Sequence, residues 1–238
     1  MKKLLLLLIT IVSVSAASAQ NKKDFSKIKA RAGDHIMLQI SNDRWMGTPD
    51  SIKNRMKGFA RGFNAAVMLD KVFKGSPQFS IAFGLGISTS GIYFEKTGIT
   101  INSTTAKLPF NKLDSLDHYK KYKLATSYLE IPIELRYSND PLHDSKSIKA
   151  AIGFKVGTLL NVHTKGKTLQ DKSDRNINSH TAKITDKRFF NSTRIAATAR
   201  IGYGNFSLFG SYQINNIFKD GVAADVKLLQ VGLTISGL

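Results

Sequence analysis

Two short segments carry the residue types that acid–base chemistry uses. The segment DSLDHY (114–119) groups two aspartates, a serine and a histidine, and LHDS (142–145) places a histidine two residues before a serine. Such side chains can transfer protons or bind a metal weakly, but solvated loops collect them without any catalysis. The chain contains no glycine-rich phosphate loop, HExxH sequence or calcium loop. We therefore expect no enzyme, no metal site and no cofactor.

The elements that position these side chains are strands. In YLEIPIELRY (128–137), aliphatic residues alternate with polar or charged ones, and FSIAFGLGIS, SIKAAIGFKVG and RIAATARIGY repeat the pattern. A period of two places one kind of side chain on each face of a strand. With weaker segments included, the pattern predicts eight strands, at residues 34–42, 58–70, 78–93, 124–138, 147–163, 192–204, 206–217 and 225–236. Several exceed the ~5–6 residues usual in soluble sheets and match the ~9–11 that cross a bilayer.

The connections between these strands alternate in length, with the longest loops predicted at 94–123 and 164–191. An even-stranded barrel with long loops at one end and short turns at the other is the outer-membrane pattern. Alternation alone also fits a soluble, lipocalin-like barrel. However, the polar face is rich in Gly, Ala and Ser, as a narrow lumen requires, and aromatic residues gather at both ends of the apolar face. We predict an all-β fold: an eight-stranded antiparallel up-and-down transmembrane β-barrel in the outer membrane, with both termini periplasmic.

The N-terminus has the layout of a secretory signal peptide. Two lysines, an apolar run and small residues precede a cleavage point, which predicts a signal peptide at 1–19. A basic lead-in at 20–33 and a single barrel domain at 34–238 follow. The chain has no cysteine and a formal net charge of +18. Such a charge suits nucleic acid or an anionic surface, and export excludes nucleic acid, which leaves outer-membrane lipid and lipopolysaccharide as partners.

If the aliphatic face contacts lipid, the opposite face of each strand lines the lumen. That face collects seven charged residues: Glu130, Glu134, Arg136, Lys149, Lys155, Arg194 and Arg200. Opposite charges can pair across a packed lumen and satisfy one another. The basic excess among them also leaves room for an anion or a small pore. Eight strands enclose little more than their own side chains, which favours the packed interpretation.

The predicted loop at 164–191 is strongly basic. Seven of its residues are cationic: Lys165, Lys167, Lys172, Arg175, Lys183, Lys187 and Arg188. Outside the cell, such a loop could contact the phosphates and carboxylates of a glycolipid leaflet. An ordinary solvated loop has the same composition, and the sequence does not separate these two interpretations.

Three parts of the chain resemble the PorT-like outer-membrane β-barrel proteins of the Bacteroidota: FSIAFGLGIS, YLEIPIELRY with IKAAIGFKVGTLLNVHTK, and LFGSYQINNIFKDG before VGLTI. The resemblance implies an outer-membrane barrel and brings no catalytic residues. The founding member is implicated in the type IX secretion system. The resemblance therefore implies a non-enzymatic scaffold or accessory of protein secretion or envelope assembly, with secretion-system proteins as partners. The alternatives are a small pore or anion-binding channel and a lipid A-modifying enzyme.

Overall fold

The computed structural model describes residues 35–236, so the predicted signal peptide and basic lead-in lie outside the described residues. Eight long strands form the body: β1 (Ile36–Met46), β2 (Arg61–Phe73), β3 (Ser76–Phe94), β6 (His118–Ser138), β7 (Ile148–Gln170), β9 (Thr193–Tyr203), β10 (Phe206–Gln213) and β11 (Lys227–Ser236). The connections hold five smaller elements: α2 (Asp50–Lys53), β4 (Thr97–Ile99), β5 (Phe110–Lys112), a 3-10 helix (Asp144–Lys146) and β8 (Asn176–Thr185).

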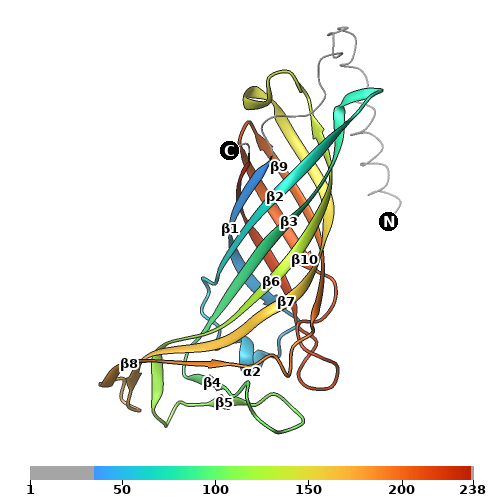
Figure 1. Cartoon of the computed structure of the whole chain (residues 1–238). Helices are drawn as coiled ribbons and strands as arrows, with labels where there is room; N and C mark the ends of the chain where they lie inside the picture. Colours follow the sequence, from blue (N-terminus) through green and yellow to red (C-terminus); the bar gives the residue numbers. More distant parts are fainter. Residues whose placement is uncertain (1–34, 237–238) are drawn as a thin grey trace.

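The eight long strands close into an antiparallel barrel, which confirms the predicted fold class. Their order around the ring is β6-β3-β2-β1-β11-β10-β9-β7, and pairing of β6 with β7 closes it. Short turns join β2 to β3, β6 to β7 and β9 to β10 at one end. The smaller elements α2, β4, β5 and β8 gather at the other end, called the loop end here (Figure 1).

The outer surface of the barrel is an apolar band. Within β6, Ile131 and Leu135 are exposed whereas Glu130 and Glu134 are buried. Ile152 on β7 keeps 63% of its surface exposed, and other large aliphatic and aromatic side chains on the same outer face behave alike. A continuous band of this kind is stable only against hydrocarbon. The aliphatic face of the alternating pattern therefore contacts lipid, and the polar face lines the lumen.

The predicted loop boundaries were wrong at the loop end. β6 begins at His118 and β7 continues to Gln170, so the two strands keep pairing beyond the barrel wall, and β8 adds a third strand inside the segment predicted as a loop at 164–191. We call this three-stranded part the sheet extension, formed by residues 118–125, 163–170 and 176–185. In the extension, β6 and β7 alternate lysine with tyrosine or small residues, and β8 is largely polar, so the hydrophobic pattern does not reveal these strands.

An apolar core fills the loop end of the barrel. Trp45 lies at its centre, with ring centroids 5.5 Å from both Phe94 and Phe218 in edge-to-face contacts. Ile101 and Leu108 from the β3–β6 connection and Phe189 from the β8–β9 connection pack into the same buried cluster. The connections thus fold inward over the lumen, because their apolar side chains find burial there that a solvated loop would not offer. Among the described residues, no helix is long and apolar enough to span a membrane.

Candidate functional site in the lumen and the sheet extension

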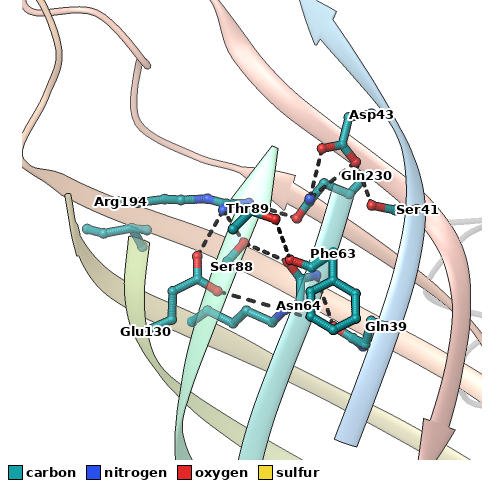
Figure 2. Close-up of polar contacts among 12 residues, drawn as sticks. Gln39, Ser41, Asp43, Phe63, Asn64, Ser88, Thr89, Glu130, Arg194 and Gln230 are labelled. Carbon is teal, nitrogen blue, oxygen red and sulfur yellow. Dashed lines mark hydrogen bonds and ion pairs between the residues drawn. The ribbon is translucent and has the colours of Figure 1, made fainter. Parts of the chain in front are cut away.

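Arg194 on β9 is the centre of a buried polar network in the middle of the lumen (Figure 2). One of its guanidinium nitrogens donates to the Gln230 side-chain oxygen at 2.9 Å, and the other donates to the Ser88 hydroxyl at 3.0 Å. The latter nitrogen is also 2.9 Å from a Glu130 carboxylate oxygen, which makes an ion pair rather than an aligned hydrogen bond. The guanidinium carbon lies 5.4 Å from the Tyr128 ring centroid. Arg194 therefore ties β9, β11, β3 and β6 together across the lumen.

The same network continues from Ser88 toward β7. The Ser88 hydroxyl donates to Asn64 at 2.6 Å, and the Asn64 amide donates to the Gln39 side-chain oxygen at 3.2 Å. Lys155 Nζ donates to that Gln39 oxygen at 3.1 Å and lies 3.9 Å from Glu130. Polar groups from opposite walls therefore satisfy one another directly, as burial requires.

Asp43 on β1 completes the network on its other side. Both of its carboxylate oxygens accept from the Gln230 amide at 3.2 Å, and one accepts from the Ser41 hydroxyl at 2.5 Å. The predicted first strand ends at residue 42, whereas β1 continues to Met46, so Asp43 falls outside the prediction. The alternation Gln39, Ser41, Asp43 would have placed it in the lumen had the strand been continued.

A second cluster lies nearer the short turns, around Glu134. One oxygen of its carboxylate accepts from Arg136 Nε at 2.9 Å and from Arg200 at 3.1 and 3.3 Å. Arg136 also lies 3.7 Å from Asp70, whose side chain is fully buried, and Arg200 donates to the Ser236 hydroxyl at 3.5 Å. Two guanidinium groups therefore share one carboxylate.

The seventh predicted lumen residue, Lys149, is buried on β7, in register with Ser138 and Gly202. The predicted set holds five cations and two carboxylates. Asp43 and Asp70 raise the carboxylates to four, so the described charges of the lumen nearly balance. This arrangement fits mutual pairing better than it fits a site for a free anion.

The lumen is filled by side chains. A cavity of about 10 Å³ lies beside Glu130 and Lys155, and another of about 10 Å³ is lined by Trp45 and Tyr128. Either volume can hold about one water molecule. A pore would need a continuous water path, and the apolar core that contains Trp45 covers the loop end of this lumen.

Two residues of the cluster at 114–119 join separate loops through hydrogen bonds, and we call each such connection a tether. Asp114 accepts two hydrogen bonds from Arg55, at 2.9 and 2.5 Å, which joins it to the β1–β2 connection. His118 Nε2 lies 2.9 Å from Asp174, and Lys96 donates to the other oxygen of Asp174 at 3.0 Å. The structure therefore explains Asp114 and His118 through these contacts between loops.

The second candidate pair, in LHDS (142–145), lies at the opposite end of the barrel. His143 Nδ1 is 3.2 Å from Asp140 in the β6–β7 turn, among the short turns. The two histidine-containing segments therefore do not share a site.

The tether at Asp174 should be sensitive to pH. Hydrogen bonds from Lys96 and then His118 hold the pKa of Asp174 below its ordinary value of 3.8. Because the folded pKa is lowered, the tether is complete above pH 3.8 and is lost as the pH falls through the folded pKa. A nitroxide at Ser173→Cys, unique in a chain without cysteine, should become more mobile over that acidic range in electron paramagnetic resonance spectra.

In Asp174→Asn, the same label should be mobile already at neutral pH. Asparagine tolerates the positive φ of 63° at this position, so the substitution removes charge without adding backbone strain. Asp220→Asn, in the β10–β11 connection, is the matched control and should leave the label immobile. Equal label mobility in the wild type and Asp174→Asn at neutral pH would contradict the tether.

The seven cations predicted at 164–191 occupy three different places. Lys165 and Lys167 on β7 and Lys183 on β8 lie in the sheet extension, Lys172 and Arg175 lie at the hairpin tip, and Lys187 and Arg188 follow β8. Arg175 pairs with Asp171 at 2.8 Å, and Arg188 donates to the carbonyls of Ser103 and Thr104 at 3.3 Å. The structure therefore separates them, and only the three in the sheet extension share one sheet face.

The family described as outer membrane protein beta-barrel domain matches residues 18–220 of the chain. A search of curated proteins found no match.

Among solved structures, the chain is similar to Ail, the attachment invasion locus protein of Yersinia pestis, at 14% identity over 84% of this chain and 95% of that chain, with a TM-score of 0.34. For Ail in complex with the heparin analogue sucrose octasulfate, the identity is 13% over 84% of this chain and 96% of that chain, and the TM-score is 0.32. A mutant porin of Rh. blastica is 9% identical over 84% of this chain and 98% of the porin chain, with a TM-score of 0.20. At these values the likeness does not extend to function.

Proposed function

The chain belongs to the outer membrane protein β-barrel domain family, and from that premise we propose that it is a non-enzymatic scaffold for protein secretion or envelope assembly. In this proposal the barrel anchors the sheet extension, and the extension offers a docking strand to a partner protein. The observation that carries the proposal is the free edge of β8. Because short turns face the periplasm in this architecture, the partner would be met on the cell-surface side.

Within residues 35–236, β8 is the last strand of the sheet and pairs with β7 alone. The Asp186 amide donates to the Val162 carbonyl at 3.2 Å. This bond shows which residue pairs of β7 and β8 are hydrogen-bonded to each other and which are not. From that register, the backbone amides and carbonyls of Thr181, Lys183 and Thr185 point away from β7, toward the free edge.

This edge is regular next to the barrel: the two register irregularities of the β7–β8 pair lie beyond Thr181, toward the hairpin tip, and residues 181–185 pair evenly. Exposed edge strands are normally short, charged or interrupted by proline. β8 has ten residues, no proline and a single charged residue, Lys183. An extended segment of a partner can therefore add to it through main-chain hydrogen bonds, a common mode of peptide recognition.

Two further observations support a scaffold over the alternatives. The packed lumen and the apolar core at its loop end favour an anchor rather than a channel. Asp114 in the β3–β6 connection and His118 at the start of β6, two of the acid–base candidates, already contact other loops. The resemblance of the three sequence segments to PorT-like barrels suggests secretion as the process that the scaffold serves.

The proposal is tested by affinity purification of the tagged protein from native outer membranes in mild detergent, with quantitative mass spectrometry. The wild type and Thr181→Val should recover a partner in stoichiometric amount. Thr181→Pro removes the outward amide while keeping the bonds to β7, so recovery should fall about tenfold, as expected for a loss of ~1.4 kcal/mol. Recovery of the barrel and lipopolysaccharide alone, or of one partner equally by all three proteins, would refute the docking strand.

A further inference from the structure

Lysines lie opposite one another across the three strands of the sheet extension. Lys123 on β6 is opposite Lys165 on β7, and Lys165 is opposite Lys183 on β8. On the next rung, Lys121 is opposite Lys167. We call these five residues the lysine ladder. Each is exposed or half-buried, and none takes part in an ion pair among the described residues.

This arrangement is unfavourable within the chain itself. The alternation set by Asp186 makes Lys165 and Lys183 a non-hydrogen-bonded pair, the type in which opposite side chains come closest. Like charges directly opposite each other destabilise a sheet. His163 lies one rung closer to the barrel. Burial lowers its pKa most, and the positive charges of Lys183, Lys123 and Lys165 lower it further. A positive potential is therefore maintained here, and no carboxylate in the described part of the chain pairs with these lysines.

The lysine ladder is directed back toward the membrane. The residues that alternate with it, including Tyr122, Gly166 and Ala182, line a hollow of about 200 Å³ with Ile99 and Leu113 of the β4–β5 region. Figure 1 shows β4 and β5 farther from the barrel than β8, and the sheet extension running out to the side. Because successive side chains of a strand point to opposite faces, the lysines project from the other face, toward the apolar band.

At the border of the apolar band at the loop end, Lys123 of the lysine ladder and two other basic residues lie over aromatic rings. Lys123 lies 5.8 Å from the Tyr93 ring centroid, and Lys227 lies 6.0 Å from that of Tyr212. Arg61 lies 5.6 Å from the centroid of Phe59. Aromatic and basic side chains of this kind mark the headgroup level of a membrane. The lysine ladder therefore extends this basic border sideways over the headgroups.

We propose that the lysine ladder binds the phosphate groups of a phosphorylated glycolipid of the outer leaflet, of the lipid A type. Ammonium groups recognise phosphate as point charges, and a flat array of them can accept the several phosphates of one headgroup or of neighbouring headgroups. Phosphate would relieve the repulsion between opposite lysines, so lipid binding and stability of the sheet extension are coupled. The site is independent of any protein bound to the edge of β8.

The test is native mass spectrometry of the purified protein titrated with bisphosphorylated lipid A or with its dephosphorylated form. In the triple variant Lys123→Gln/Lys165→Gln/Lys183→Gln, affinity for the phosphorylated lipid should fall at least about tenfold. The control Lys107→Gln/Lys172→Gln/Lys187→Gln removes the same charge from other loop-end positions and should stay within about twofold. Dephosphorylated lipid A should bind all three proteins weakly and alike.

A second measurement separates a lipid site from a merely structural role. Without glycolipid, protease resistance of the sheet extension should be equal or higher in the ladder variant, because repulsion is removed. With phosphorylated lipid A, resistance should rise in the wild type alone. Equal lipid binding by both triple variants, binding that ignores the phosphates, or loss of an acidic protein partner with lipid binding intact would overturn the proposal.

Discussion

Replacing Glu134 with alanine is expected to destabilise the barrel by about 3–5 kcal/mol, the range for breaking a buried ion pair by removing one partner. Glu134 accepts hydrogen bonds from both Arg136 and Arg200 through a single carboxylate oxygen. All three side chains are almost fully buried. Without the carboxylate, two guanidinium groups would remain in the lumen without their shared acceptor, and the contact of Arg136 with Asp70 is longer, at 3.7 Å.

The measurement is a urea titration of the protein folded in detergent micelles, followed by fluorescence of Trp45, the single tryptophan. Trp45 lies in the apolar core, so its emission reports unfolding of the barrel. Glu134→Gln keeps an acceptor but loses the charge and should cost less than alanine. Glu95→Ala, which removes an exposed carboxylate at the loop end, should leave the midpoint nearly unchanged. If Glu134→Ala and Glu95→Ala unfold at the same urea concentration, the two arginines do not depend on Glu134.

Replacing Gly232 with valine is expected to prevent normal closure of the barrel, at a cost of about 3 kcal/mol or more. Gly232 on β11 faces the lumen, where β1 comes very close. A Cβ atom there would overlap the Ile40 carbonyl oxygen and lie 2.6 Å from the Ser41 Cα. Both obstacles are backbone, which cannot rotate away as a flexible side chain can, so the β1–β11 pairing itself would have to shift.

Gly210 on the neighbouring strand β10 provides the matched control. A Cβ atom at Gly210 meets nothing within 4 Å, and the residue lies on the lipid-facing side of its strand. Gly210→Val should therefore fold as well as the wild type, or slightly better, because it adds apolar surface in contact with lipid and restricts the unfolded chain. The folded fraction after assembly in vesicles, read from heat-modifiable gel mobility, should be low for Gly232→Val alone. Equal mobility shifts in the two variants would disprove the steric argument.

Much of the barrel follows from the alternating pattern. Leu135 and Ile131 are exposed and Glu134 and Arg136 are buried because a strand separates its side chains with a period of two, whatever lies beside it. The prediction failed beyond the apolar band, where both faces of a strand carry polar side chains and the residue type no longer indicates which face a residue occupies. Lys121 and Lys123 continue the outer face of β6 beyond the apolar band, so their alternation with Tyr122 resembles a solvated loop although they are in a strand.

Asp43 and Asp70 were missed for a related reason. Each lies near an end of a predicted strand, where the number of residues that pair depends on the partner strand and cannot be judged from one segment. The apolar core around Trp45 is a stronger case, because it joins β1 to connections as distant as Leu108 and Phe218. Several of its members, among them Leu108, Phe189 and Phe218, lie in connections that have no periodic pattern.

The sequence by itself determined which face of each long strand meets lipid, how many long strands cross the membrane and seven of the charges that enter the lumen. These features depend on side-chain direction along one strand, a local property of the chain. Only the tertiary structure decided which carboxylate serves which arginine, how the lumen is covered and that Lys123, Lys165 and Lys183 stand on one rung. These features depend on the register between strands far apart in the sequence, which is set by pairing and closure of the whole barrel.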